Sequence, residues 1–240
     1  SVLNTNIWGI KSSATLIGDL QAIFEDLKTG VSNSAFDTGL INTRSSSQEV
    51  YQNPEYTGNF GVVKLFGKST TIFNPKTYDV TSQSSSFNKA TIKTDTGDIT
   101  VTGTFTYSDS SNGIETTSVK ITNVSFLGAD QVTKWSATTN IVDVQSYNWN
   151  TDTVKAGPGN TQKYTALSTT DAQGNAITFA GSIEYVQKTD AFTGSMTSMT
   201  LKVGDTTISS AGLKMTYSQV SALSLTTVSA LLPSLLTGAD

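Results

Sequence analysis

Apolar residues near the start of the chain recur at the spacing of an α-helix. On one helical face they stand at Leu16, Ile17, Leu20, Ile23, Phe24 and Leu27. Ser12 or Ser13 can cap the first turn, Lys28 lies in the last turn, and Gly30 follows as a stop signal. The pattern predicts one amphipathic helix over 13–29 that packs across a sheet. A face that binds a partner is the alternative.

From residue 60 almost to the end, apolar and polar residues alternate as they do in β-strands. Turn signals separate the runs, among them Asp-Thr-Gly-Asp at 95–98, Ser-Asn-Gly at 111–113 and Gly-Pro-Gly-Asn at 157–160. Because no helical period intervenes, we expect a mainly β (α+β) fold. It would be an antiparallel meander or sandwich in a single domain over 1–240, with a β core at 60–219 and a strand and helix within 1–30.

One strand pattern occurs twice. Residues 99–107 align without a gap with residues 177–185, and each copy begins a similar hairpin unit, near 95–126 and 171–208. The likeness is explained equally well by duplication and by convergence of Thr-rich strands. Gly103 and Gly181 stand at equivalent points of the two copies. A Gly inside a strand marks a bulge or a close backbone approach, so we predict such a feature at both positions.

Two stretches depart from the strand pattern. Residues 31–59 are polar and rich in turn signals, including Asn53-Pro54, and predict a surface excursion. Residues 220–236 are apolar and carry no charge, and we expect subunit contacts in the C-terminal segment 220–240 and at the N-terminus. Packing back on the core is the alternative. The predicted assembly residues are Val2, Leu3, Ile7, Trp8, Ile10, Leu223, Leu225, Val228, Leu231, Leu232 and Leu235.

The amino-acid composition limits the kinds of functional site that the chain can form. The 240 residues include no His and no Cys, Arg44 is the only Arg, charged residues make up 14% and the net charge is −4. Catalytic triads, thiol nucleophiles and His-ligated zinc sites therefore cannot be built. The negative net charge, together with the lack of a basic cluster in the sequence, disfavours binding to nucleic acid. No apolar run is long enough to span a bilayer, so we expect no membrane insertion, and the first residues lack a signal-peptide pattern.

The remaining candidate sites have simpler explanations. A pair of carboxylates could hydrolyse a glycosidic bond, but most Asp residues stand in turns, and Glu184 is expected on a solvated strand face. Asp95 with Asp98, and Asp109 with Asn112, could ligate calcium, but neither pair follows a calcium-loop spacing. We therefore expect no catalytic residue, no metal and no cofactor.

Aromatic residues offer one further candidate. Trp8, Trp135 and Trp149, with Tyr147, could form a platform on which a sugar stacks. Burial in a β core is the default expectation for such side chains.

One segment resembles a known family. Gly-Ser-Ile-Glu-Tyr at 181–185, followed by Phe-Thr-Gly-Ser-Met-Thr-Ser-Met-Thr-Leu at 192–201, is similar to the strand-loop-strand segment of bacterial secreted haemophores. The resemblance implies an α+β fold, export by type I secretion and a haem-ligating tyrosine at Tyr185.

The observations together favour a non-enzymatic structural protein that is secreted or located on the surface of a bacterial cell. We expect a self-assembling protomer of a filament, matrix or surface layer, or an adhesin module, whose partners are further copies of itself and cell-surface components. A haemophore-like carrier of a small ligand is the alternative, and a carbohydrate-binding or carbohydrate-hydrolysing domain is the second.

Overall fold

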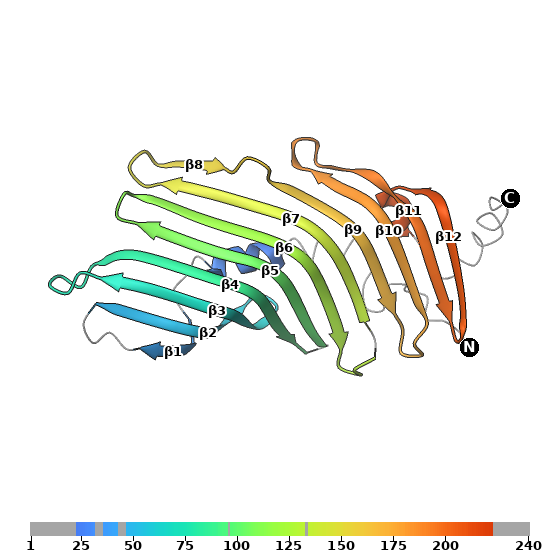
Figure 1. Ribbon diagram of the computed structural model, residues 1–240, viewed down its shortest axis with the longest axis horizontal. Helices are drawn as coiled ribbons and strands as arrows, with labels where there is room; N and C mark the ends of the chain where they lie inside the picture. The colour runs from blue at the N-terminus through green and yellow to red at the C-terminus, as the bar shows by residue number, and fades with distance from the viewer. Residues whose placement is uncertain (1–22, 32–35, 43–46, 96, 133, 223–240) are drawn as a thin grey trace.

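A computed structural model describes residues 23–31, 36–42, 47–95, 97–132 and 134–222, and shows a 12-stranded antiparallel sheet (Figure 1). The strands are β1 (Thr38–Asn42), β2 (Gln48–Gly58), β3 (Gly61–Phe73), β4 (Val80–Thr94), β5 (Gly97–Ser110), β6 (Ile114–Gly128), β7 (Lys134–Asn148), β8 (Thr153–Ala156), β9 (Thr161–Thr170), β10 (Ala176–Val186), β11 (Ala191–Val203) and β12 (Thr206–Met215). The helical elements are residues 23–31, the short 3-10 turn η1 (Gln187–Thr189) and α2 (Tyr217–Ala222).

The strands lie side by side in the order in which they follow in the chain. The path runs from β1 to β12, except that β8 branches off and pairs with β7. The predicted mainly β, antiparallel fold with an N-terminal helix is confirmed, and it is a single-sheet meander rather than a sandwich. Within the described parts of the chain, none of the helices is both long and apolar enough to cross a membrane.

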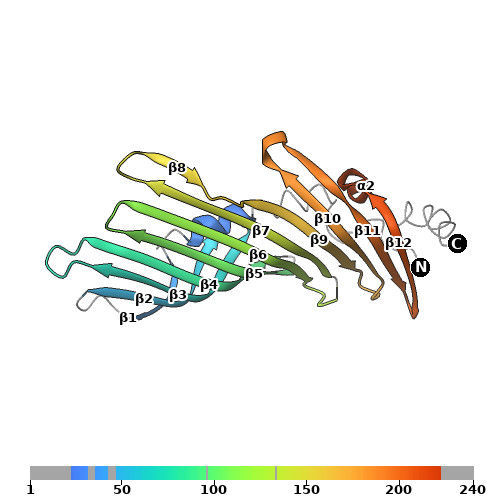
Figure 2. The ribbon, with the colours of Figure 1, turned by 45° about the horizontal axis from the view of Figure 1, so that its top comes forward.

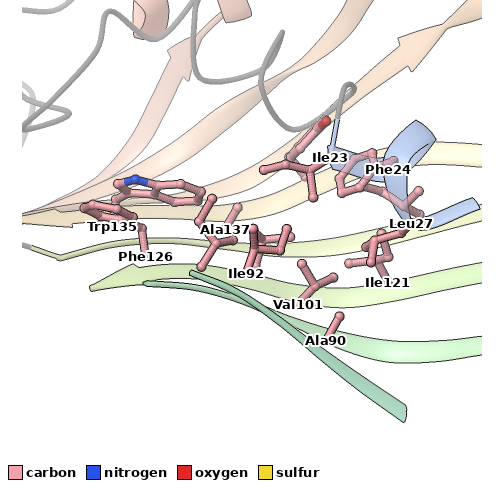
Figure 3. Packing of buried hydrophobic residues seen from close by; sticks show 14 of the residues in the cluster. Ile23, Phe24, Leu27, Ala90, Ile92, Val101, Ile121, Phe126, Trp135 and Ala137 are labelled. Atoms are coloured by element: carbon pink, nitrogen blue, oxygen red, sulfur yellow. The ribbon is translucent and has the colours of Figure 1, made fainter. Parts of the chain in front are cut away.

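The helical residues 23–31 pack on one face of the sheet. Ile23, Phe24 and Leu27 are buried, as their spacing predicts, and Figure 3 shows them directed towards sheet residues such as Ile121. The predicted beginning of this helix, with its Ser caps, lies outside the described residues. At the other end of the sheet, α2 lies beside β11 and β12 (Figure 2). The core therefore occupies one face of the sheet.

Gly30 does not stop the helix, contrary to the sequence prediction. It lies within the helical residues, and Val31 after it is fully buried. A Cβ at Gly30 would stand 2.1 Å from the ring of Tyr56, whose hydroxyl donates a hydrogen bond to the Asp26 carbonyl at 3.2 Å. Gly30 is thus suited to the close approach of the helix to β2 rather than to a turn.

The predicted surface excursion over 31–59 is wrong in part, because this stretch contains β1 and β2. Its turn signal, Asn53-Pro54, lies inside β2, where the pairing with β3 shifts register. Asn53 has a positive φ of 46°, and its side-chain Oδ1 accepts a hydrogen bond from the Gly67 backbone N–H at 3.0 Å. The bulge interrupts the alternation of buried residues and so conceals the strand.

A continuous line of register shifts crosses the sheet. Every pair of neighbouring strands on the path from β2 to β12 contains such a shift. In each interior strand, the shifts in its two pairings fall at the same point along the strand. Bulges bend the strand that contains them and increase its twist. The line accounts for the strong curvature of the sheet in Figure 1.

Two kinds of residue support this line of bulges. Gly103 and Gly181 stand at register shifts, as predicted from the repeated pattern, and their neighbours leave no room for a Cβ. The residues skipped opposite them are Thr122 and Thr197. Both threonine hydroxyls donate across the bulge to a carbonyl oxygen of the neighbouring strand, at 3.1 and 3.4 Å. The two similar hairpin units thus contain the same kind of bulge, with the same kind of hydrogen bond across it.

The face of the sheet opposite the core carries a row of hydroxyl side chains. The register places eight of them directly opposite one another on successive strands of the path from β4 to β12: Thr91, Thr100, Ser125, Ser136, Ser168, Thr178, Thr200 and Ser209. Hydrogen bonds join Ser168 to Thr178 at 2.9 Å and Thr200 to Ser209 at 3.2 Å. Cross-strand pairs of this kind stabilise a sheet without charge.

Candidate functional site

A pocket of about 630 Å³ opens between the helical residues 23–31 and the middle of the sheet. The helix contributes Phe24, Glu25 and Lys28, and the sheet contributes residues from β6 to β10. Side chains from segments far apart in the chain meet here because the helix crosses several strands. The volume lies within the usual range of small-ligand sites, roughly 300–1,000 Å³.

Lys28 lies at the centre of the charges in this pocket. Its ammonium group lies 2.8 Å from an Asp143 carboxylate oxygen and 3.0 Å from one of Glu25. Burial acts to lower the pKa of Lys28, but the hydrogen bonds to Asp143 and Glu25 outweigh it, so the pKa is raised overall. The lysine is therefore held in its charged form and ties the helix to β7.

Asn160 fixes the carboxylate that Lys28 contacts. Its side-chain amide donates to Asp143 Oδ1 at 3.3 Å and to the Val144 carbonyl at 3.1 Å, while its Oδ1 accepts from the Val144 backbone N–H at 2.9 Å. These bonds hold the loop before β9 against β7. The position of Asp143 is thereby set from both the helix and the loop.

Glu184 occupies the wall of the same pocket. It accepts a hydrogen bond from the Thr161 hydroxyl at 3.1 Å and lies 3.4 Å from the Lys163 ammonium group. Its side chain is 40% exposed and alternates with the buried Ile183, as the strand pattern predicts. The sequence pattern missed that this glutamate lines a pocket together with Asp143 and Lys28.

Tyr185, the predicted haem ligand, also lines this pocket. Its hydroxyl donates a hydrogen bond to Asp190 at 2.7 Å, and its ring packs against Phe192, which stacks on Tyr217. The hydrogen bond to Asp190, helped by burial and by the charge of that carboxylate, raises the pKa of the Tyr185 phenol. A raised pKa disfavours the phenolate form that binds iron.

We therefore expect that haemin added to the purified protein forms no stable tyrosinate complex. A titration followed by absorption spectroscopy, in parallel with Tyr185→Phe, tests this prediction. The spectra of the two proteins should coincide. A tyrosinate band that saturates with the native chain and disappears in Tyr185→Phe would show that Tyr185 is a haem ligand after all.

Trp135 and Trp149 do not form a common platform. Trp135 is buried and stacks on Phe126 at a centroid distance of 5.9 Å, whereas Trp149 is 61% exposed and lies edge-on to Tyr147 beyond β7. Trp8 lies outside the described residues. Trp135 thus follows the default expectation of a core aromatic, and Trp149 with Tyr147 forms a separate exposed pair.

The two candidate calcium pairs do not belong to a cluster of acidic residues in the described part of the chain. The described part of the chain contains no group of three or more acidic residues that could hold a metal ion. Asn112 instead accepts hydrogen bonds from the Ser110 hydroxyl at 2.6 Å and the Ile114 backbone N–H at 3.0 Å. These are the bonds of a tight turn, as the simpler explanation proposed.

All eleven predicted assembly residues, in segments 2–10 and 223–235, lie outside the described residues. Sequence reasoning missed Asp143 and Asn160, and it placed Lys28 only as a helix-terminal charge.

No protein-family model, curated protein or solved structure matches the chain.

Proposed function

We propose that the chain is a non-enzymatic structural protein that is exported and self-assembles through the edge of its sheet at β12. The proposal is supported by the regular edge that β12 forms, among the described residues, at the end of the sheet. Its first six residues, 206–211, contain no Pro and no charge, and they pair with β11 without a register shift. Such an edge is a template for another strand.

The opposite edge of the sheet is much less suited to pairing. β1 has five residues, and its pairing with β2 contains two register shifts. Short and irregular edge strands are a common protection against association. The second half of β12 is protected in the same way, since the register shifts between Ala211 and Met215, and Lys214 lies there. One half-strand is therefore the favoured contact.

Strand direction indicates how two copies meet. Eleven strands lie on the path from β1 to β12, and each neighbouring pair on it is antiparallel, so β1 and β12 run in the same direction. Head-to-tail addition of β1 to β12 would then create a parallel pair. Two β12 strands related by a two-fold axis form an antiparallel pair, which continues the pattern of the sheet and is slightly more stable.

The outer face of the sheet supports the same arrangement. The row of hydroxyl side chains ends at Ser209 on β12, directly opposite Thr200. Pairing of two β12 strands would extend this row into the second copy, with Ser and Thr opposite each other and no like charges in contact. The assembled unit is then one continuous sheet of two copies.

The test measures the size of the full chain by light scattering. Ser209→Lys places a charge on the proposed contact, and Ser136→Lys places the same charge in the same row on the central strand β7. We expect dimers or larger assemblies for the native chain and for Ser136→Lys, and monomers for Ser209→Lys. A native chain that is monomeric at high concentration, or a Ser209→Lys variant that assembles normally, would contradict the proposal.

A further inference from the structure

We propose that the pocket beneath the helical residues 23–31 binds a neutral ligand with several hydroxyl groups, of the sugar class. This inference is independent of the assembly through β12. It rests on the charges, the hydrogen-bonding groups and the apolar surfaces that the pocket brings together.

The charges of the pocket are compensated within the protein. Lys28 is bound by Asp143 and Glu25, and Glu184 faces Lys163 at 3.4 Å. An anionic ligand such as a phosphate would meet these carboxylates and would have to compete with two of them for Lys28. A ligand without charge avoids this competition.

The polar side chains suit hydroxyl groups. Carboxylates accept hydrogen bonds and amides both donate and accept, which matches a hydroxyl group that does both. Gln145 lines the pocket from β7, is exposed, and makes no side-chain hydrogen bond among the described residues. Its amide is therefore available to a ligand, next to the carboxylate of Asp143, which Lys28 and Asn160 hold in place.

The pocket also offers the apolar contact that a sugar ring requires. Phe24 and Tyr185 lie in its lining, and the aromatic contacts of Tyr185 with Phe192, together with its bond to Asp190, hold the tyrosine in place. A ring fixed in this way loses little conformational freedom when a ligand packs against it. Both requirements of a sugar, polar edges and an apolar face, are met in one cavity.

The test uses the full chain and four neutral probes: glucose, galactose, mannose and N-acetylglucosamine, with glucose 6-phosphate as the anionic comparison. Saturation-transfer NMR detects binding, and titration gives the dissociation constant. Gln145→Ala removes the available amide, and Ala156→Trp fills the pocket from the exposed strand β8. Gln173→Ala, in the exposed turn between β9 and β10, is the matched control.

We expect at least one neutral probe to bind more tightly than glucose 6-phosphate. Gln145→Ala should weaken that probe by about fivefold, the effect of one hydrogen bond. Ala156→Trp should abolish binding, and Gln173→Ala should leave it unchanged. The proposal is overturned if none of the four neutral sugars binds, if the phosphate binds best, or if binding survives in Ala156→Trp while the fold is intact.

Discussion

Gly103→Val is expected to destabilise the protein by about 3 kcal/mol or more. A Cβ at Gly103 would stand 1.9 Å from the Lys120 carbonyl oxygen and 2.9 Å from the Ile121 Cα, both backbone atoms of β6. Neither atom moves without disturbing the bulge at the centre of the sheet. Urea unfolding, followed by circular dichroism, measures the loss.

The matched control for this variant is Gly174→Ala. Gly174 has a positive φ of 79°, but no atom lies within 4 Å of the position of a Cβ. Its substitution therefore tests backbone conformation alone, with an expected cost of about 1 kcal/mol. If Gly103→Val costs less than about 0.5 kcal/mol, the level of an ordinary surface change, the close packing of the bulge line is refuted.

Lys28→Met is expected to destabilise the protein by about 1–2 kcal/mol at neutral pH. The side chain of Lys28 is 15% exposed, and its removal leaves Asp143 and Glu25 without their counter-charge. Lys64→Met is the control, because the Lys64–Glu55 pair has the same kind of contact, at 2.9 Å, on more exposed side chains. It should cost less than about 0.5 kcal/mol.

The pH dependence of the Lys28 contribution has a definite sign. The pKa of Lys28 is raised above the ordinary value of 10.5, because its hydrogen bonds outweigh burial. A group with a raised folded-state pKa stabilises the protein fully below the unfolded-state pKa and less as pH rises through the folded-state value. The difference in stability between the native chain and Lys28→Met should therefore be constant near neutrality and shrink above about pH 10. A difference that grows in alkaline solution would contradict this account.

Local patterns predicted the parts of the fold that depend on local chemistry. The helical spacing placed Ile23, Phe24 and Leu27 in the core, and the repeated strand pattern located the bulges at Gly103 and Gly181. In both cases the signal lies within a few residues. The same reasoning failed at β2, because Asn53-Pro54 has the composition of a turn while the neighbouring strand β3 holds it in a bulge.

The pocket could not be predicted from the sequence, because the residues that form it are far apart in the chain. Lys28 and Asp143 are 115 residues apart in the chain, and nothing in the neighbourhood of either residue indicates the other. Their contact depends on which strands the helix crosses, which only the folded sheet determines. Tyr185 and Glu184 were noticed as a sequence motif, but their place in the lining of the same pocket as Lys28 follows from the same crossing.

A cysteine scan determines whether two β12 strands pair antiparallel. The chain contains no Cys, so one Cys at a time at residues 207 to 211 is the sole thiol of each variant. A two-fold axis brings one residue of β12 opposite its own copy, within the Cα distance of about 4.4–6.8 Å that a disulfide requires. We predict rapid disulfide-linked dimers at one position and little cross-linking two residues away on either side. Equal cross-linking at every position, or none at any of the five, would contradict the pairing of two β12 strands.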